Sequence, residues 1–256
     1  MKKGIYKLVL VIVLLVLAVG SCRKAGSWLV KSDDIQHADA MIMLMGRIPD
    51  RVLHISDLYQ EDVAGEVWIV EEGSGSKSML EERGVYIIST TEQVYGAFRD
   101  LGIAEESIVI LPGGATSTQM EAEITRDYLA TRAGTGQTVT NQAGTNQAST
   151  GRSGTNQAET NQASTGRFGI DQAVMGRSGI DTLLVVSSAS HTRRAHQIFS
   201  AAVKSLDHPV HICCSPSPYT DFNAQKWWKD REDIQDVFIE YVKMANFLLF
   251  EKRHLK

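Results

Sequence analysis

Short apolar runs alternate with stretches of helical periodicity from Asp39 to the end of the chain. This alternation is typical of a parallel sheet whose strands are joined by crossover helices. It predicts an α/β fold, a doubly wound, mostly parallel Rossmann-like sheet of about five strands with flanking helices. The runs predicted to be strands are Ala40 to Met45, Val67 to Val70, Ile108 to Leu111, Leu183 to Val186 and Val210 to Cys214.

Helices are predicted between and after these strands. Val52, Ile55 and Leu58 recur at helical spacing after the first strand. Thr91 stands at an N-cap position before the next helix, and Ser117 or Thr118 does so before a helix that reaches about Ala130. The last helix is predicted to bury an apolar stripe of Ile234, Val237, Phe238, Tyr241, Ala245 and Leu248.

The stretch from Ala133 to Gly179 interrupts this pattern. From Thr140 it divides into pentads such as TNQAG and TGRSG, and a larger unit of three pentads recurs, which indicates tandem duplication. It has almost no large apolar side chains, so it cannot offset the entropy of ordering itself, and we expect a disordered surface loop. Residues 38–132 and 181–256 are then two parts of one α/β domain, with a low-complexity insertion at 133–180.

The first residues have the order of an export signal. Lys2, Lys3 and Lys7 precede an apolar run from Leu8 to Val19, and small residues follow it up to Cys22. The run is short for a helix that spans a bilayer core of roughly 30 Å. Val-Gly-Ser-Cys resembles a lipobox, which predicts cleavage before the cysteine and its diacylation; two acyl chains anchor a protein stably.

Two alternatives to a lipoprotein remain. The run is an uncleaved single-pass anchor from about Ile5, with the lysines on the cytoplasmic side, or it is a buried core helix. In the lipoprotein and the anchored form, residues 1–21 are a signal sequence or membrane anchor and residues 22–37 are a linker. The domain is then anchored to the bacterial cell membrane and faces outside the cytoplasm.

Composition argues against several function classes. The chain has 26 basic and 30 acidic residues and a net charge of -4, so nucleic acid is not an expected partner. Adjacent Cys213 and Cys214 bridge only through a strained ring, and we expect two buried strand residues. No metal site and no cofactor are predicted, because the sequence has no short-spaced ligand cluster, no Gly-x-Gly-x-x-Gly and no phosphate-binding lysine loop.

Polar residues follow four of the predicted strands. In an open parallel sheet ligands collect at this edge, where helix N-termini present unpaired N–H groups. The sequence therefore predicts a single rim at which these residues converge. The candidate proton-transfer residues are His191 and Glu121, and the candidate ligand-binding residues are Gly46, Arg51, Ser74, Thr118, Ser187 and Arg194.

The order of motifs along the chain is more specific than any one of them. An Asp-Ala opens a strand that ends in glycine, and an arginine begins the next helix. Ser-Thr-x-x-Glu-Ala, Ser-x-x-x-His-x-x-Arg-Ala, a Trp-Trp pair and Glu-x-x-Lys follow. They stand at Asp39 to Gly46, Arg51, Ser117 to Ala122, Ser187 to Ala195, Trp227-Trp228 and Glu240 to Lys243.

This order resembles the ElyC/SanA/YdcF envelope family, over about Asp39 to Lys243 apart from the insertion. The resemblance implies an N-terminal membrane anchor and an association with cell-envelope polysaccharide metabolism. The chain departs from the family where Arg47 replaces a small residue and where Leu111 to Gly114 replaces an acidic one. Glu71-Glu72-Gly73 stands where a Ser-Gly-Gly turn is usual, and its carboxylates would repel a phosphate, so the ligand chemistry is expected to differ or to be weakened.

Individual roles stay open at this point. Arg194 would pair with a phosphate or carboxylate while His191 exchanges a proton, or His191 caps the helix and Arg194 bonds a core carboxylate. Arg51 at a helix start requires an anion, from a ligand or from an aspartate. Thr118 is a ligand contact or a cap that forms a capping box with Glu121. A serine hydrolase is disfavoured because no nucleophile elbow occurs.

Together these features predict a membrane-anchored extracytoplasmic protein that acts in peptidoglycan or surface polysaccharide biogenesis. Its expected ligand is an anionic or phosphorylated small molecule, for example a lipid-linked sugar phosphate. One alternative is a noncatalytic module that binds a nucleotide-like ligand or S-adenosylmethionine. Another is a structural partner of envelope-synthesis complexes.

Overall fold

The computed structural model describes residues 20, 22–73, 75, 77–135, 179–253 and 255. The predicted signal segment up to residue 19, the candidate Ser74 and most of the pentad insertion therefore lie outside the described residues. Among the helices that the structure does describe, none has the length and apolarity needed to cross a bilayer.

Five strands form one parallel sheet in the order β3-β2-β1-β4-β5. This is the order of a doubly wound fold, with a topological switch point between β1 and β4. The predicted Rossmann-like α/β architecture is thus confirmed. The strands span Ala40–Met43 (β1), Val67–Glu72 (β2), Ile108–Ala115 (β3), Thr182–Ser188 (β4) and His211–Ser217 (β5).

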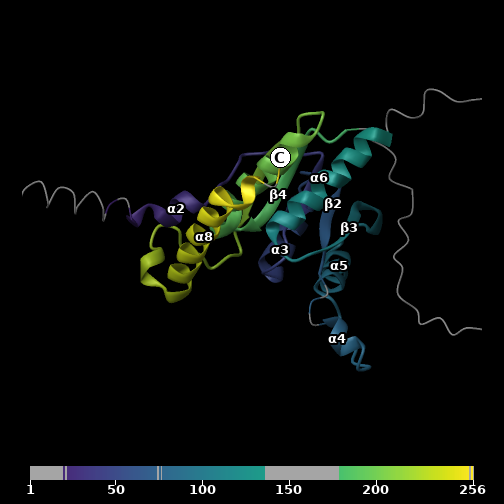
Figure 1. Cartoon of the computed structure of the whole chain (residues 1–256), viewed down its shortest axis with the longest axis horizontal. Coiled ribbons are helices and arrows are strands. Elements are labelled where there is room, and N and C mark those ends of the chain that lie inside the picture. The colour runs from purple at the N-terminus through teal and green to yellow at the C-terminus, as the bar shows by residue number, and fades with distance from the viewer. Residues whose placement is uncertain are drawn as a thin grey trace, which may run out of the picture.

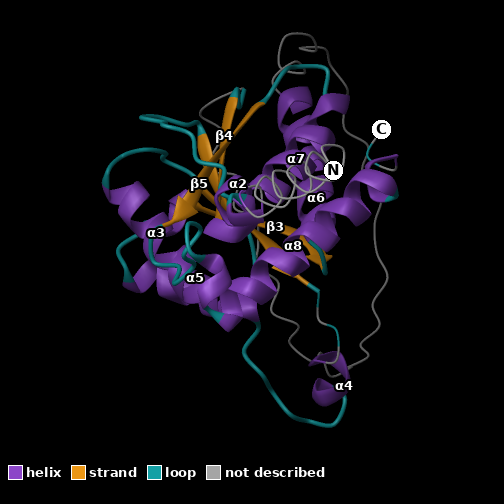
Figure 2. Cartoon of the chain, turned by 90° about the vertical axis from the view of Figure 1, so that its left-hand side faces the viewer, coloured by secondary structure: helices purple, strands orange, loops and turns teal. Residues whose placement is uncertain are grey.

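Helices cover both faces of this sheet. Figure 2 shows α3 and α5 on one side of the strands and α6 and α7 on the other. In Figure 1, α8 and α2 lie together at one end of the molecule, and α4 stands away from the sheet. The helices are α2 (Ala25–Leu29), α3 (Ile48–Gln60), α4 (Lys77–Glu81), α5 (Thr90–Asp100), α6 (Thr118–Thr135), α7 (Thr192–Ala202) and α8 (Arg231–Leu249).

Five short 3₁₀ turns complete the described elements. They precede or follow helices and strands and set the direction of the chain there. Their bounds are η1 (Glu105–Ser107), η2 (Ala189–His191), η3 (Val203–Ser205), η4 (Trp227–Lys229) and η5 (Glu251–Arg253).

Four strands run past the residues predicted to end them, and β1 ends at Met43, before its predicted end. β4 reaches Ser188 and β5 reaches Ser217. β2 continues through Glu72, and β3 continues through Pro112, Gly113 and Gly114 to Ala115. The pairing register shifts at this point, which is the mark of a β-bulge. Both glycines have positive φ, 156° and 64°, so the Pro-Gly-Gly run bends the strand rather than breaking it.

The predicted cap of α5 is also wrong. Ser89, and not Thr91, is the N-cap: its hydroxyl accepts from the backbone N–H of Glu92, whose carboxylate accepts from Ser89 in return. This is a capping box, which needs an acidic residue three positions on. Thr91 lies inside the helix, and its hydroxyl instead accepts from the backbone N–H of Glu72.

The core has one layer on each face of the sheet. Residues of alternate parity on the strands fill the two layers, as the side-chain period of two requires. Ile42 and Trp68 belong to the layer under α6 and α7, whereas Met41 and Ile69 belong to the layer under α3 and α5. Continuous apolar strands are therefore explained by burial on both faces.

The buried face of α8 differs from the predicted stripe. The helix buries Asp233, Val237, Glu240, Met244 and Phe247. Of the predicted stripe only Val237 is fully buried, while the other apolar members with side chains larger than alanine are Ile234, Phe238, Tyr241 and Leu248, all exposed. The second half of α8 is apolar on more than one side, so its periodicity did not identify the face that packs on the domain.

Candidate functional site

The site lies where β1 and β4 end and their chains turn into helices on opposite faces of the sheet. Crevices of this kind form at the switch point of doubly wound sheets. β1 leads into Gly46, which has a φ of 132° and lies so close to Arg51 that a Cβ would come 3.2 Å from its Nη1. Glycine is therefore required for the close approach of this guanidinium.

Arg51 is held by the protein itself. Its Nη1 donates to the carbonyl oxygens of Leu44 and Met45 at 2.6 Å each, and its Nε donates to Ser188 Oγ at 3.1 Å. The side chain is buried beside Asp50. Asp50 contributes favourable charge to the guanidinium, while the hydrogen bonds of Arg51 go to two carbonyls after β1 and to a serine of β4, so Arg51 ties the end of β1 to β4.

Asp50 is the acceptor at the centre of this arrangement. Its Oδ2 accepts from Ser188 Oγ at 2.9 Å and from Thr220 Oγ1 at 3.0 Å, and its backbone oxygen accepts from Ser217 Oγ. Hydroxyls from β4 and from the loop after β5 thus converge on one buried carboxylate, and a hydroxyl of β5 donates to the backbone oxygen of the same residue. The sequence interpretation did not single out Asp50, although it is the acidic residue next to Arg51.

Glu121 lies one turn into α6 and points towards the end of β1. Its Oε1 accepts from the backbone N–H of Met45 at 2.7 Å. Burial raises the pKa of this carboxyl to about 7, against the opposing effects of that hydrogen bond and of Arg51. A carboxyl group with such a pKa exchanges a proton near neutral pH, which is the property expected of a general acid or base.

His191 and Arg194 converge on Glu240 of α8. Arg194 donates from Nε and Nη2 to the two carboxylate oxygens at 2.7 and 3.0 Å, and His191 Nδ1 lies 3.2 Å from Oε2. Burial works to raise the pKa of Glu240, but these two partners outweigh it and lower the pKa to about 2. Arg194 thus bonds a carboxylate of the protein, the structural alternative named for it.

Burial also lowers the pKa of His191 to about 4, despite its hydrogen bond with Glu240. The imidazole is therefore neutral near pH 7 and can accept a proton. Its Nε2 faces Thr118 Oγ1 at 3.3 Å, across from the nitrogen that meets Glu240. Glu240, His191 and Thr118 thus form a chain of polar groups that leads from the core to the start of α6.

The predicted capping box of Thr118 and Glu121 is not formed. Ser117 Oγ accepts from the backbone N–H of Met120 at 3.3 Å, so Ser117 caps α6. The hydroxyl of Thr118 therefore lies against His191, and the carboxylate of Glu121 accepts from the backbone N–H of Met45. Both residues are thereby turned towards the rim of the sheet.

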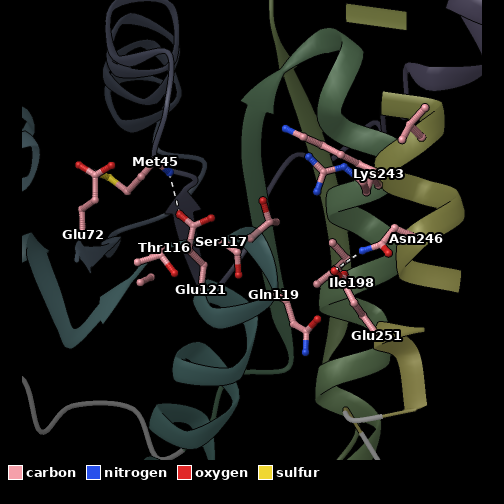
Figure 3. A pocket seen from close by; sticks show the side chains of 14 residues that line it. Met45, Glu72, Thr116, Ser117, Gln119, Glu121, Ile198, Lys243, Asn246 and Glu251 are labelled. Carbon is pink, nitrogen blue, oxygen red and sulfur yellow. Dashed lines mark hydrogen bonds between the residues drawn. The ribbon is translucent and has the colours of Figure 1, made fainter. Parts of the chain in front are cut away.

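A cavity of about 570 Å³ opens over these groups. Figure 3 shows Glu121, Ser117 and Gln119 on one side of it and Lys243, Asn246 and Glu251 on the other. Most of the lining residues are polar or charged, and many of them hydrogen-bond hydroxyls. It comprises Met45, Glu72, Ala115, Thr116, Ser117, Thr118, Gln119, Glu121, Arg194, Ile198, Val242, Lys243, Asn246 and Glu251.

Lys243 has a distinct place in this lining. The other cation there, Arg194, is neutralised by Glu240, whereas no ion pair of Lys243 occurs among the described residues. Sequence reasoning noted the Glu-x-x-Lys motif that carries Glu240 and Lys243 but assigned neither a role. The two residues are three positions apart on α8. Glu240 is buried in the core, and Lys243 is exposed at the rim of the cavity.

The acidic end of β2 borders a second cavity of about 440 Å³, lined by both Glu71 and Glu72 together with Lys77 and the start of α5. Glu72 also borders the first cavity. Each cavity therefore has carboxylate groups in its lining, and at least one of them comes from the Glu71-Glu72 pair that the sequence placed at the ligand site. Ser74, the ligand-binding candidate there, falls outside the described residues.

Ser187 at the end of β4 is fully buried, and its Oγ has no hydrogen-bond partner among the described residues. A buried hydroxyl without a partner costs free energy, and such a group often binds a water or a ligand.

The other candidates at the sheet edge divide into two sets. Glu121, Thr118 and Arg194 line one cavity, and His191 is buried behind Thr118. Gly46 and Arg51 instead lie at the switch point.

Cys213 and Cys214 agree with the prediction of two buried strand residues. Cys213 and Cys214 are buried and free, and burial raises the pKa of Cys214 to about 12, which makes its thiol inert. Cys22 is free and exposed. Within the described parts of the chain, no group of acidic, histidine or cysteine side chains has the arrangement of a metal site.

Comparisons with models of protein families, with curated proteins and with solved structures found no match. The class of protein is thus defined by the fold and the site alone. It is a doubly wound α/β protein with a cavity, lined mostly by polar residues, at the carboxyl edge of its sheet.

Proposed function

We propose that this chain is a membrane-tethered, extracytoplasmic α/β protein of the ElyC/SanA/YdcF type that binds a small anionic, hydroxyl-rich molecule during cell-envelope biogenesis. A phosphorylated sugar has this chemistry. The observation that supports it best is the cavity, where Glu121, with its raised pKa, shares the lining with hydroxyl-binding side chains and with Lys243, a cation that has no ion pair within the described part of the chain.

Positive charge in the cavity comes from two sources. Lys243 supplies a full charge at the rim. The first turn of α6, which is 18 residues long, supplies backbone N–H groups and the positive end of a helix dipole. A phosphate or carboxylate between them would meet favourable charge from both sides.

The remaining lining suits the hydroxyl groups of a sugar. Gln119, Asn246 and Thr116 offer neutral donors and acceptors, and Glu72 and Glu251 accept from hydroxyls. The same carboxylates repel a ligand that carries many negative charges. The lining therefore favours a ligand with one anionic group on a polyhydroxy body over a polyphosphate.

Thermal-shift titration of the detergent-solubilised full chain tests this proposal. The probes are glucose 1-phosphate, inorganic phosphate and glucose, because a ligand that binds only the native state raises the melting temperature. We expect the sugar phosphate to stabilise the protein most, and Lys243→Gln to weaken its binding about tenfold or more. Lys204→Gln, at an exposed lysine outside the cavity, is the matched control.

Each other outcome counts against the proposal in a definite way. Equal shifts for Lys243→Gln and the wild type would exclude the cavity as the site. Stabilisation by S-adenosylmethionine or nucleotides alone would favour the noncatalytic nucleotide-like module. Absence of any shift would leave a structural partner of envelope-synthesis complexes as the better hypothesis.

The chain from Glu240 through His191 to Thr118 favours a second candidate, an enzyme that acts on the same ligand. Neutral His191, oriented by Glu240, would take a proton from a hydroxyl or a water at Thr118, and Glu121 would supply or accept the other proton. Water would give its proton to His191 as it attacks phosphorus, one P–O bond of the lipid-linked sugar phosphate would break, and the leaving oxygen would take a proton from Glu121. Release of the resulting phosphomonoester, lost in His191→Asn while ligand binding persists, would establish the enzyme. Binding without turnover in the wild type would exclude it.

A further inference from the structure

The outward side of α8 is apolar from Phe238 to Leu249, over the second half of the helix. Phe238, Val242, Ala245 and Leu249 follow one another at helical spacing and form what we call the outer stripe. Their exposed fractions are 67% for Phe238, 65% for Val242 and 58% for Leu249. A surface helix normally carries polar residues on this side, so an apolar stripe of this length marks an interaction surface.

The outer stripe lies beside the point where the apolar N-terminal run joins the domain. That run ends at Val19, and α2 begins six residues later. α2 is fastened to α8, because Trp28 stacks on Tyr241 with ring centroids 5.6 Å apart and Tyr241 Oη donates to Ala25 O at 3.2 Å. A tether at residues 8–22 therefore holds α8 close to whatever surface the tether enters.

The residues around this junction are those that favour a lipid interface. Trp28 and Tyr241 are amphipathic aromatic rings, which concentrate at the level of lipid head groups. Arg23 lies over the ring of Trp228 at 5.2 Å and Arg193 over the ring of Trp28 at 4.7 Å. Their guanidinium groups provide positive charge for anionic lipids next to the apolar stripe.

We propose that the outer stripe of α8 lies on the surface of a lipid bilayer, with its apolar side chains among the head groups and upper acyl chains. The proposal rests on the membrane tether of the proposed function for the position of the bilayer, and on the exposed side chains of α8 for the contact. It goes beyond a tether, because the folded domain itself then has a fixed orientation on the membrane.

This orientation has a consequence for the cavity. Val242 belongs to the outer stripe and also to the cavity lining, and Lys243 follows it at the rim. The opening of the cavity would therefore face the head-group region. An anionic head group could enter from the bilayer while its lipid tail stayed in the membrane, so the favoured ligand is an amphiphile rather than a free metabolite.

Fluorescence quenching from within the bilayer tests the contact. The full chain carries Phe238→Cys labelled with an environment-sensitive dye, in phosphatidylglycerol and phosphatidylcholine vesicles whose acyl chains bear nitroxides. Labelled wild type corrects for dye on Cys22, the exposed native thiol. Glu61→Cys, an exposed position after α3 on the opposite face of the sheet, is the matched control. We expect quenching by half or more at position 238 and little at position 61.

A second variant examines the stripe itself. Val242→Glu with Leu249→Glu places two charges on it, and both positions are exposed, so the melting temperature should not change. We expect these substitutions to restore the aqueous spectrum of the dye at position 238. Persistent quenching in this variant would overturn the proposed contact.

The remaining outcomes separate the proposal from its premise. If the chain floats with vesicles but position 238 stays aqueous, the tether stands and the contact is refuted. If the chain does not float, both are refuted. Self-quenching that rises with the protein-to-lipid ratio, without quenching by nitroxide lipids, would show that a second copy of the chain covers α8 instead.

Discussion

Glu121 is a carboxyl group that the fold holds in a place where its charge is costly. Burial raises the pKa to about 7 from 4.5, so the folded protein binds a proton that the unfolded chain releases between these two pH values. The free energy of unfolding therefore falls as the pH rises from 4.5 to 7, by about 3 kcal/mol in all. A site that keeps such a residue has a use for a neutral-range proton donor or acceptor.

Replacing Glu121 by Gln removes this charge and keeps an oxygen for the Met45 N–H. We expect Glu121→Gln to be more stable than the wild type at pH 8 and to differ little at pH 4.5. Urea denaturation at the two pH values measures the difference. Glu123→Gln, two residues further along α6, is the control. An equal stability gain at both pH values would contradict the assigned pKa.

Neighbouring serines at the end of β4 have opposite surroundings. Ser188 accepts from Arg51 and donates to Asp50, whereas the hydroxyl of Ser187 has no partner among the described residues. Ser188→Ala should cost about 1 to 3 kcal/mol of unfolding free energy, because two buried charged groups each lose a hydrogen bond. Ser187→Ala should be neutral or slightly stabilising.

Denaturation of the two alanine variants under identical conditions measures this contrast. Comparable losses would mean that Ser187 has a partner, such as an ordered water, and that its hydroxyl is satisfied in solution. A gain for Ser187→Ala together with weaker sugar phosphate binding would identify Ser187 as a ligand contact.

At the scale of elements, the sequence predicted what depends on local pattern. The five apolar runs became the five strands, and Glu121, His191 and Arg194 gathered at one rim because each follows the carboxyl end of a parallel strand. Strand ends were harder to predict: Pro112-Gly113-Gly114 has the composition of a turn, yet its positive φ values serve a bulge inside β3.

What the sequence could not supply was the packing of α8. The second half of the helix is apolar on more than one side, so periodicity gave no reason to prefer Val237 and Met244 over Phe238 and Leu248 as core residues. The partners of His191 and Arg194 depend on this choice, because the same rotation that buries Met244 brings Glu240 into the core. Tertiary packing, and not the local sequence pattern, therefore determined the partners of His191 and Arg194.

α2 is attached to the segment that precedes α8 through a contact that admits no side chain. A Cβ on Gly26 would lie 2.6 Å from both the carbonyl oxygen of Ala224 and the ring of Trp227. Gly26→Ala should therefore displace α2 or η4 and cost about 1 to 3 kcal/mol of unfolding free energy. Gly96→Ala in α5, where a Cβ meets nothing within 4 Å, should instead stabilise the protein by up to about 1 kcal/mol.

Thermal unfolding of the two variants, together with the accessibility of Trp28 to an aqueous quencher, measures the effect. A stable Gly26→Ala protein with unchanged quenching of Trp28 would show that α2 is not fixed to the domain in solution. That result would also remove the structural link between the tether and the outer stripe of α8.

At the scale of the whole molecule, the described residues form a continuous core on both faces of the sheet, from α3 to β5. The chain leaves this core at Thr135, the end of α6, and re-enters it at Ile180, which is 2% exposed. The pentad insertion lies between these points. Its polar composition argues that the domain does not need it for folding.

Deletion of Thr140 to Arg177 tests this, and it retains Gly179 and Ile180 as the approach to β4. Closure entropy depends on the logarithm of loop length, so shortening should stabilise the fold by about 2 kcal/mol at most. We therefore expect a melting temperature that is unchanged or a few degrees higher. Ile180→Ala should lower it, because removing buried methyl groups costs about 2 to 4 kcal/mol. A deletion variant as unstable as Ile180→Ala would mean that the pentads pack on the domain, since only lost contacts can outweigh the gain from a shorter connection.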